Sequence, residues 1–159
     1  MATTNRDMSF FMADKIEKVT EEEVYVSKRI KDNDGKVIPF IMKAISTDRI
    51  EELEKDCVEP VFEKGKKVGE KFNRPKWLAR IGIESTVYPD FKDKDLLKSY
   101  NVVSSLEAVK KVLSVGGEYA EWIGVTQRIN GFEEDFEDLV EEAKNLSKAE
   151  TETPSTHTS

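Results

Sequence analysis

The segment Asp32-Asn33-Asp34-Gly35 constrains the fold of this chain more than any other short feature. Asn and Asp tolerate a positive φ and Gly favours it, so the segment predicts a tight turn. On both sides of it, apolar and polar residues alternate as they do in strands with one buried face. We therefore predict a β-hairpin over about residues 23–44. Pro39 should lie at an edge or a bulge, because it cannot donate a ladder hydrogen bond.

After residue 44 the apolar residues recur with the period of an α-helix, and capping residues mark helix starts: Ser46 or Thr47, Asn73, and Ser104. Pro60 and Gly65 indicate a loop or a small hairpin. A short helix capped by Ser9 is predicted near the N-terminus. Longer helices are predicted over about residues 46–58, 73–88, 93–100, 104–113, 117–129 and 132–146. The predicted class is α+β: a mainly α-helical single domain with an N-terminal β-hairpin.

The length of 159 residues suits one domain. Two Trp, four Tyr and eight Phe supply large side chains for a core, which argues against disorder of the whole chain. Residues 1–8 are polar and are predicted to be a flexible N-terminus. The domain is expected over 9–149, and residues 150–159 are expected to form a disordered polar tail.

The single cysteine and the lack of a long apolar run indicate a cytoplasmic protein. There are 25 basic and 32 acidic residues, a net charge of −7, which disfavours binding to phosphate backbones. No stretch approaches the roughly 20 apolar residues that cross a bilayer, so no membrane partner is expected. Cys57 is the only cysteine and cannot form an internal disulfide, which fits a reducing compartment.

The residues that usually carry catalysis are scarce. One cysteine and one histidine cannot supply a zinc site, and His157 lies in the predicted tail, far from any nucleophile that it could activate. The turn at 32–35 lacks the distal bidentate Glu of a calcium loop. The glycines at 65 and 69 do not match a phosphate-binding loop. We predict no catalytic, cofactor-binding or metal-binding residues, and therefore no enzyme.

Two stretches of opposite charge stand out. Residues 64–80 carry a balance of +6 and residues 131–150 a balance of −6. They are either two solvated surfaces or complementary patches for self-association or partner docking. The acidic residues also suit the first turns of a helix, where they complement its dipole. The basic members are Lys64, Lys66, Lys67, Lys71, Arg74, Lys76 and Arg80, and the acidic members of that first-turn group are Glu133, Glu134, Asp135, Glu137 and Asp138.

Four stretches, in order over about residues 9–146, together resemble one protein family. They are Val26-Ser27-Lys28-Arg29-Ile30-Lys31-Asp32 with Asp34-Gly35-Lys36-Val37-Ile38-Pro39-Phe40 and Lys43-Ala44-Ile45; Val87-Tyr88-Pro89-Asp90-Phe91-Lys92-Asp93 with Asp95-Leu96 and Ser99-Tyr100; Gly117-Glu118-Tyr119; and Asn130-Gly131-Phe132 with Glu141-Glu142-Ala143-Lys144-Asn145. The chain resembles the XkdN-like tail assembly chaperones of contractile-tailed phages and defective prophages. Asn101 departs from the pattern, in which Gly is expected after Ser-Tyr. Asn also accepts a left-handed conformation, so only the local turn is affected.

The resemblance implies a non-enzymatic protein without cofactors. Such a chaperone binds the tape measure protein and assists assembly of the tail tube around it. It acts in the host cytoplasm and is not expected in the mature virion. The tail tube protein and a second copy of the chain are further candidate partners.

A tape measure protein is long and helical with exposed apolar stripes, so its carrier needs large apolar groups beyond those of its core. Two alternatives stay open: a structural tail or baseplate component, and a small nucleic-acid-binding regulator that uses residues 64–80. The candidate partner-binding residues are Phe10, Phe11, Trp77, Tyr119, Trp122 and Phe136.

Overall fold

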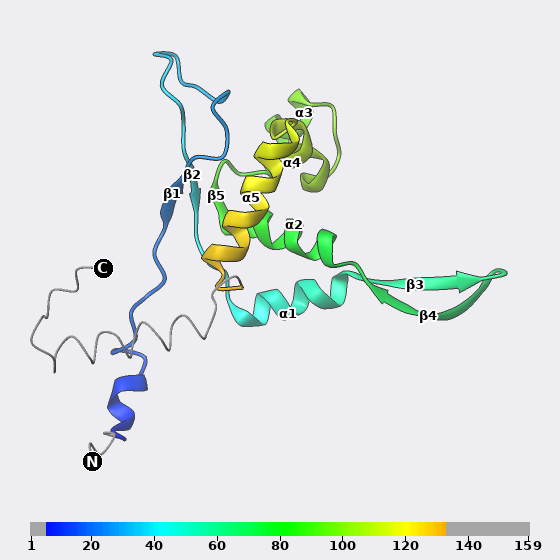
Figure 1. The fold of residues 1–159 in the computed structure, drawn as a ribbon, viewed down its shortest axis with the longest axis horizontal. Helices are drawn as coiled ribbons and strands as arrows, with labels where there is room; N and C mark the ends of the chain where they lie inside the picture. The colour runs from blue at the N-terminus through cyan, green and yellow to red at the C-terminus, as the bar shows by residue number, and fades with distance from the viewer. Residues whose placement is uncertain (1–5, 133–159) are drawn as a thin grey trace, which may run out of the picture.

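The structure of the protein is a computed structural model that describes residues 6–132 (Figure 1). These residues form five α-helices, one short 3-10 helix and two antiparallel sheets. The fold is therefore mixed α+β, as predicted. The prediction that it is mainly helical is not confirmed, because the two sheets make up much of the architecture. The predicted last helix and the polar tail lie outside the described residues.

A small three-stranded sheet joins distant parts of the sequence. Its strands are β1 (Glu22–Val24), β2 (Phe40–Met42) and β5 (Thr86–Tyr88), in the order β1-β2-β5 with antiparallel pairing. Val24 pairs with Phe40, and both side chains are buried. The central strand β2 therefore connects the N-terminal region to the segment that follows residue 85.

The continuous N-terminal hairpin predicted over about 23–44 is not confirmed. Pairing of β1 with β2 covers three residues, and beyond it only the isolated bridge between Lys31 and Val37 closes the loop. The turn itself forms as expected, since Gly35 has a φ of +82° and its N–H donates to the carbonyl of Asp32. Between the sheet and the turn, residues 25–29 do not extend the ladder. Instead, Ser27 and Arg29 contact Glu118, which lies in a later helix.

Side-chain caps fix the starts of most helices at the predicted residues. Ser46, Asn73 and Ser104 each accept a hydrogen bond from a backbone N–H of the following first turn, at 3.1–3.2 Å. Asp93 does the same at 2.9 Å. The helices are α1 (Thr47–Asp56), α2 (Arg74–Ser85), α3 (Lys94–Ser99), α4 (Ser105–Val112) and α5 (Gly116–Ile129).

Two predicted boundaries were wrong. The helix expected to run to residue 88 ends at Ser85, and β5 follows directly. Thr86 ends it: its hydroxyl donates to the carbonyl of Gly82 at 2.6 Å and accepts from the indole of Trp122 at 3.0 Å. At the N-terminus, the short 3-10 helix η1 (Met8–Phe11) is capped by Asp7, not by Ser9, because the Asp7 carboxylate accepts from the Ser9 N–H.

The core lies between the three-stranded sheet and helices α2, α4 and α5. Phe91 is at its centre, with its ring centroid 5.9 Å from that of Phe40 and 6.0 Å from that of Trp122. Helix α2 packs closely on α5, where Gly82 faces the Trp122 ring. The buried cluster consists of Val24, Val26, Phe40, Met42, Ala79, Ile83, Phe91, Val109, Leu113, Trp122 and Val125.

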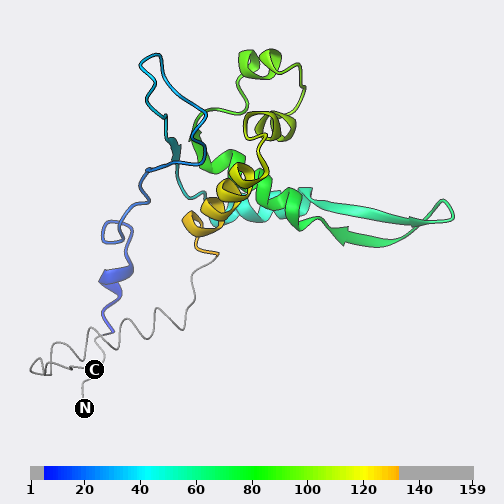
Figure 2. The same cartoon turned by 45° about the horizontal axis from the view of Figure 1, so that its top comes forward.

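A second hairpin projects from the body between α1 and α2, in both views (Figure 1 and Figure 2). It consists of β3 (Val58–Glu63) and β4 (Lys66–Phe72), and we call residues 58–72 the arm. Lys64 and Gly65 form its two-residue turn with φ values of +50° and +78°, as in the turn type that suits a twisted hairpin. All arm residues are exposed. Of the two alternatives that Pro60 and Gly65 indicated, a loop or a small hairpin, the structure has the small hairpin.

Candidate functional site

An open groove lies between the loop that follows β1 and the N-terminal end of α5. Its volume is about 780 Å³ and its lining is mostly apolar. Tyr25 and Val115, on opposite segments of the wall, are 61% and 51% exposed. Apolar side chains with this much exposure in a concave site are typical of a surface that receives another apolar group. The lining residues are Tyr25, Val26, Ser27, Lys28, Arg29, Val37, Val115, Gly117 and Glu118.

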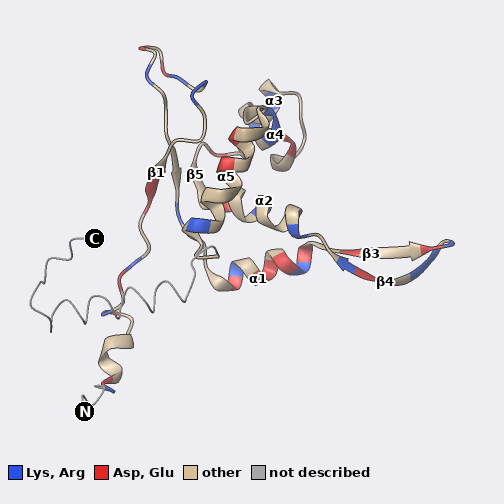
Figure 3. Ribbon diagram, in the orientation of Figure 1, with Lys and Arg blue, Asp and Glu red and all other residues tan. Residues whose placement is uncertain are grey.

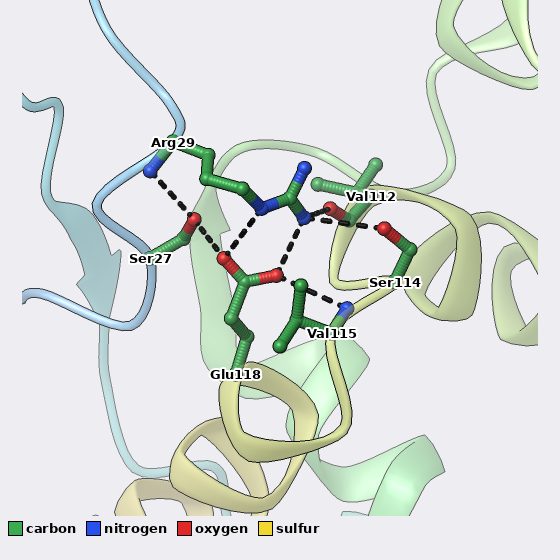
Figure 4. A network of polar contacts seen from close by, with 6 residues as sticks. All are labelled: Ser27, Arg29, Val112, Ser114, Val115 and Glu118. Atoms are coloured by element: carbon green, nitrogen blue, oxygen red, sulfur yellow. Dashed lines mark hydrogen bonds and ion pairs between the residues drawn. The ribbon is translucent and has the colours of Figure 1, made fainter.

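The polar wall of the groove is a network centred on Glu118 (Figure 4). Arg29 donates to both carboxylate oxygens, from Nε at 3.0 Å and from a terminal nitrogen at 2.6 Å. The hydroxyl of Ser27 donates to the same carboxylate. A bidentate pairing of this kind fixes orientation as well as charge. It holds the loop after β1 against α5, and so sets the shape of the groove.

Glu118 also caps its own helix. Val115 precedes α5 and has no polar side chain, so the Glu118 carboxylate accepts from the Val115 N–H at 3.3 Å. The same guanidinium of Arg29 reaches Ser114 Oγ at 3.2 Å. The Glu118 side chain is only 11% exposed. Arg29 and Ser27 together lower the pKa of Glu118 to about 2.

This pKa shift predicts a pH dependence of stability. In the unfolded chain the carboxyl titrates near its ordinary value of about 4.3, so the contribution of Glu118 is complete above that pH. It should be lost as the pH falls toward about 2. Glu118→Gln should therefore lower Tm at pH 7, and the difference from the wild type should shrink between about pH 4 and pH 2.

Thermal denaturation of both proteins over this pH range measures the effect. The matched control is Glu121→Gln on the same helix, since the exposed Glu121 side chain forms no hydrogen bond or ion pair among residues 6–132. Its Tm should follow that of the wild type at every pH. A Glu118→Gln difference that stays constant from pH 7 to pH 2 would contradict the assigned role.

The six candidate partner-binding residues lie in different environments. Phe10 and Phe11, in η1, are 57% and 68% exposed. Trp77 is half-buried and donates from its indole to the Ile50 carbonyl at 3.2 Å, while Tyr119 packs beside Trp122. Trp122 is fully buried, so it belongs to the core and offers no surface to a partner. Phe136 lies outside the described residues.

Phe10 and Phe11 belong to a longer exposed segment. Met8, Met12, Ile16 and Val19 are also more than half exposed. This N-terminal apolar segment, residues 8–19, lies apart from the helices in both orientations (Figure 1 and Figure 2). Exposed apolar groups at this density mark interaction sites.

The groove residues were missed by the sequence predictions. Tyr25 alternates with the apolar Val24 and Val26 in the segment predicted as a strand, and this alternation is a signal that could have identified it as exposed. No local signal could have brought Val115 to the same site, because that depends on how α5 packs.

The basic stretch 64–80 does not form one compact surface. Lys64, Lys66 and Lys67 lie at the arm tip, whereas Arg80 lies on α2 (Figure 3). Lys67 pairs with Glu70 at 3.1 Å, and Arg80 lies 4.0 Å from Asp56. Lys71 is on β4, and Arg74 and Lys76 are in the first turn of α2. The five acidic residues from Glu133 to Asp138 lie outside the described residues.

The remaining chemistry is limited. Cys57 is fully buried, and burial raises the pKa of its thiol, which disfavours the reactive thiolate. Within residues 6–132, no three His, Cys, Asp or Glu side chains are grouped so as to hold a metal ion. In the same range, no helix has the length and apolar character to cross a membrane.

Three of the stretches that carry the family resemblance meet in space. Ser27 and Arg29 of the first contact Glu118 of the third. Asn130 of the fourth accepts from the Ile45 N–H at 3.1 Å, which joins it to the end of the first. These residues of the resembling stretches therefore join segments that are far apart in the sequence. Asn101 has a φ of +55°, which confirms that it takes the left-handed position expected for Gly.

Comparison with known proteins identifies the family. Residues 8–144 match the model of the family described as phage XkdN-like tail assembly chaperone protein. The chain belongs to this family, and its role is in phage tail assembly.

Two relatives come from Bacillus subtilis (strain 168). The phage-like element PBSX protein XkdN is 50% identical over 139 residues, which cover 87% of this chain and 94% of the relative. The protein YqbN is 48% identical over 139 residues, 87% of this chain and 93% of the relative. The crystal structure of YqbN is similar, with a TM-score of 0.70 and 44% identity over 82% of this chain and 100% of that chain.

Proposed function

We propose that this protein is a non-enzymatic chaperone that binds the tape measure protein of its phage or prophage and assists assembly of the tail tube around it. The observation that carries the proposal is the family match over residues 8–144. The protein acts in the host cytoplasm and is absent from the finished tail. The tail tube protein is a further candidate partner.

The groove supplies a suitable surface for this task. A helix with an apolar stripe docks by placing a few large side chains in an apolar groove, and side chains on one face recur every three or four residues. Tyr25, Val37 and Val115 line such a groove, and the Arg29–Glu118 pair forms its polar side. The N-terminal apolar segment, with Phe10 and Phe11, offers a second contact for a long partner.

We expect a negative charge in the groove to weaken binding of the tape measure protein. Tyr25→Asp removes a largely exposed aromatic group, and Val115→Asp places a favoured capping residue before α5, so both variants should fold. Loss of an aromatic anchor costs about 2 kcal/mol, or roughly thirtyfold in Kd. Isothermal titration with purified tape measure fragments measures the change.

Val103→Asp is the matched control, because Val103 is 89% exposed and lies outside the groove. Its Kd should equal that of the wild type. If both groove variants bind as tightly as Val103→Asp, the groove is not the binding site.

The projecting arm and the N-terminal apolar segment favour one second candidate, a structural tail or baseplate component, since exposed apolar extensions suit contacts with neighbouring subunits. Mass spectrometry of purified particles separates the two functions. A chaperone is absent from them, whereas a structural component is present in a fixed ratio to the tube protein.

A further inference from the structure

A polar groove runs along α2 and past the start of α4, two helices that contact each other. Its volume is about 360 Å³. On α2 its lining extends from Lys76 to Glu84, which is about 12 Å of helix. We call it the α2–α4 groove, and it shares no residue with the groove beside Tyr25. The lining residues are Lys76, Arg80, Ile83, Glu84, Lys92, Ser104, Ser105 and Leu106.

The α2–α4 groove collects positive charge from two segments of the chain. Lys76 and Arg80 lie one turn apart on α2, and Lys92 lies in the loop that follows β5. With Glu84 as the one acidic residue of the lining, the balance is +2, in a chain whose net charge is −7. A cleft lined mainly by one sign of charge concentrates groups of the opposite sign. The groove therefore favours an anionic ligand.

The three cations are not used up by ion pairs within the described part of the chain. Arg80 has only a distant partner, because its terminal nitrogen lies 4.0 Å from the exposed carboxylate of Asp56. An exposed pair of this kind contributes little. Among residues 6–132, Lys76 and Lys92 form no ion pair. Their charges are therefore available to a ligand.

The acidic residues near the groove are already engaged. The Glu84 carboxylate accepts from Nε of Arg49 at 2.7 Å, and Arg49 belongs to α1. Asp90 and Asp93 lie close to Lys92 in the sequence, but neither lines the groove. Each of these two carboxylates accepts from a backbone N–H at 2.9 Å. The lining therefore presents positive charge instead of internal ion pairs.

Two hydroxyl groups add neutral donors beside the cations. Ser104 caps α4 by accepting from the Glu107 N–H at 3.2 Å, which leaves its own hydroxyl hydrogen free to donate. The hydroxyl of Ser105 has no hydrogen-bond partner among residues 6–132. Hydroxyl donors next to ammonium and guanidinium groups suit a ligand with several acceptor oxygens.

The spacing of the cations favours the carboxylates of a protein over a phosphate backbone. Side chains at positions i and i+4 of a helix, such as Lys76 and Arg80, lie about 6 Å apart, and carboxylates at i and i+4 of a partner helix have the same separation. A nucleic acid requires cations that follow its backbone, and the lysines of the arm do not line this groove. The net charge of −7 also opposes a nucleic acid.

We propose that the α2–α4 groove binds an acidic helix of a partner protein. Carboxylates at i and i+4 of that helix pair with Lys76 and Arg80, and a further carboxylate lies near Lys92. The hydroxyls of Ser104 and Ser105 donate to the same carboxylates. This site differs from the groove beside Tyr25, which takes apolar side chains, and the inference does not depend on binding of the tape measure protein.

NMR titration of the full chain tests this site. The probes are two synthetic helical peptides of equal length, one with Glu at i and i+4 along one face and the other with Gln in place of each Glu. At low salt the Glu peptide should shift the amide resonances of Lys76, Arg80, Lys92, Ser105 and Leu106. The Gln peptide should shift none of them. Binding should weaken severalfold as the ionic strength rises from about 0.01 M to about 0.15 M.

Charge-reversal variants separate the groove from general attraction between opposite charges. Lys76→Glu with Arg80→Glu should lower the affinity for the Glu peptide by about tenfold or more. Lys92→Glu changes one exposed side chain, which leaves the fold intact, and should also weaken binding. The matched control is Lys64→Glu with Lys66→Glu at the arm tip, which changes the net charge as much as the first pair and should bind like the wild type.

Three results would overturn the proposal. The first is a Glu peptide that shifts none of the groove resonances at low salt. The second is an equal loss of affinity in the groove and arm-tip variants, because it would show attraction to net charge alone. The third is an oligonucleotide of the same charge that shifts the groove resonances more strongly than the Glu peptide, which would assign the site to phosphate groups.

Discussion

Replacing Trp122 with Ala is expected to lower the free energy of unfolding by about 3–5 kcal/mol. The indole is fully buried, packs against Phe91 and Tyr119, and donates to the Thr86 hydroxyl at 3.0 Å. Truncation leaves a large cavity where α5 meets the sheet. It also removes the indole N–H that donates a hydrogen bond to the Thr86 hydroxyl. The free energy of unfolding of a domain is about 5–15 kcal/mol in total, so this substitution removes a large part of it.

Urea denaturation followed by circular dichroism measures the change, because replacing one of the two tryptophans would alter a fluorescence signal. Phe11→Ala is the control, because Phe11 is 68% exposed and its truncation should alter stability by no more than about 0.5 kcal/mol. If Trp122→Ala loses as little as Phe11→Ala, α5 does not pack on the core as described.

Gly82→Ala should destabilise the protein by about 1–3 kcal/mol, although Ala is the better helix former. A Cβ at Gly82 would lie 2.6 Å from two carbons of the Trp122 ring and 2.9 Å from Thr126 Oγ1. Neither neighbour can move away, because both are fully buried. The α2–α5 contact must therefore separate, or Trp122 must leave its place.

Gly124→Ala is the matched control, since Gly124 lies in α5 and a methyl group added there would meet no other atom within 4 Å. There the same substitution should stabilise by about 0.5–1 kcal/mol through helix propensity alone. Urea denaturation should show opposite signs for the two variants. Equal effects would mean that α2 and α5 are not in close contact at Gly82.

Local chemistry made several features predictable from the sequence. Ser46, Asn73 and Ser104 act as helix caps through a side-chain oxygen and a backbone N–H three residues later, so the signal is contained in a few positions. The turn at Gly35 is equally local.

Features that depend on tertiary contacts were not predictable. The strand β5 follows α2 because Thr86 is held by Trp122, which lies 36 residues further on, and helical spacing alone continues past Ser85. The hairpin predicted over 23–44 is interrupted because Ser27 and Arg29 bind Glu118. The sequence of residues 23–44 gives no sign of this interaction, because Glu118 lies outside that segment.

Of the residues predicted as partner contacts, the five that the structure describes do not line the groove. Phe10 and Phe11 were selected as surplus aromatic residues and are exposed, but Trp122 was selected for the same reason and is the largest fully buried side chain. Residue type alone does not separate the two cases. The groove combines Tyr25 with Val115, 90 positions apart, and only the fold brings them together.

Coexpression with the tape measure protein of the same phage or prophage tests the proposed function most directly. The measurement is the fraction of the tape measure protein in the soluble lysate, with this protein present, with it absent, and with the Tyr25→Asp variant in its place. The account predicts a soluble complex that copurifies with the wild type, and a smaller soluble fraction with the variant. A tape measure protein that is equally insoluble in all three cases would contradict the account.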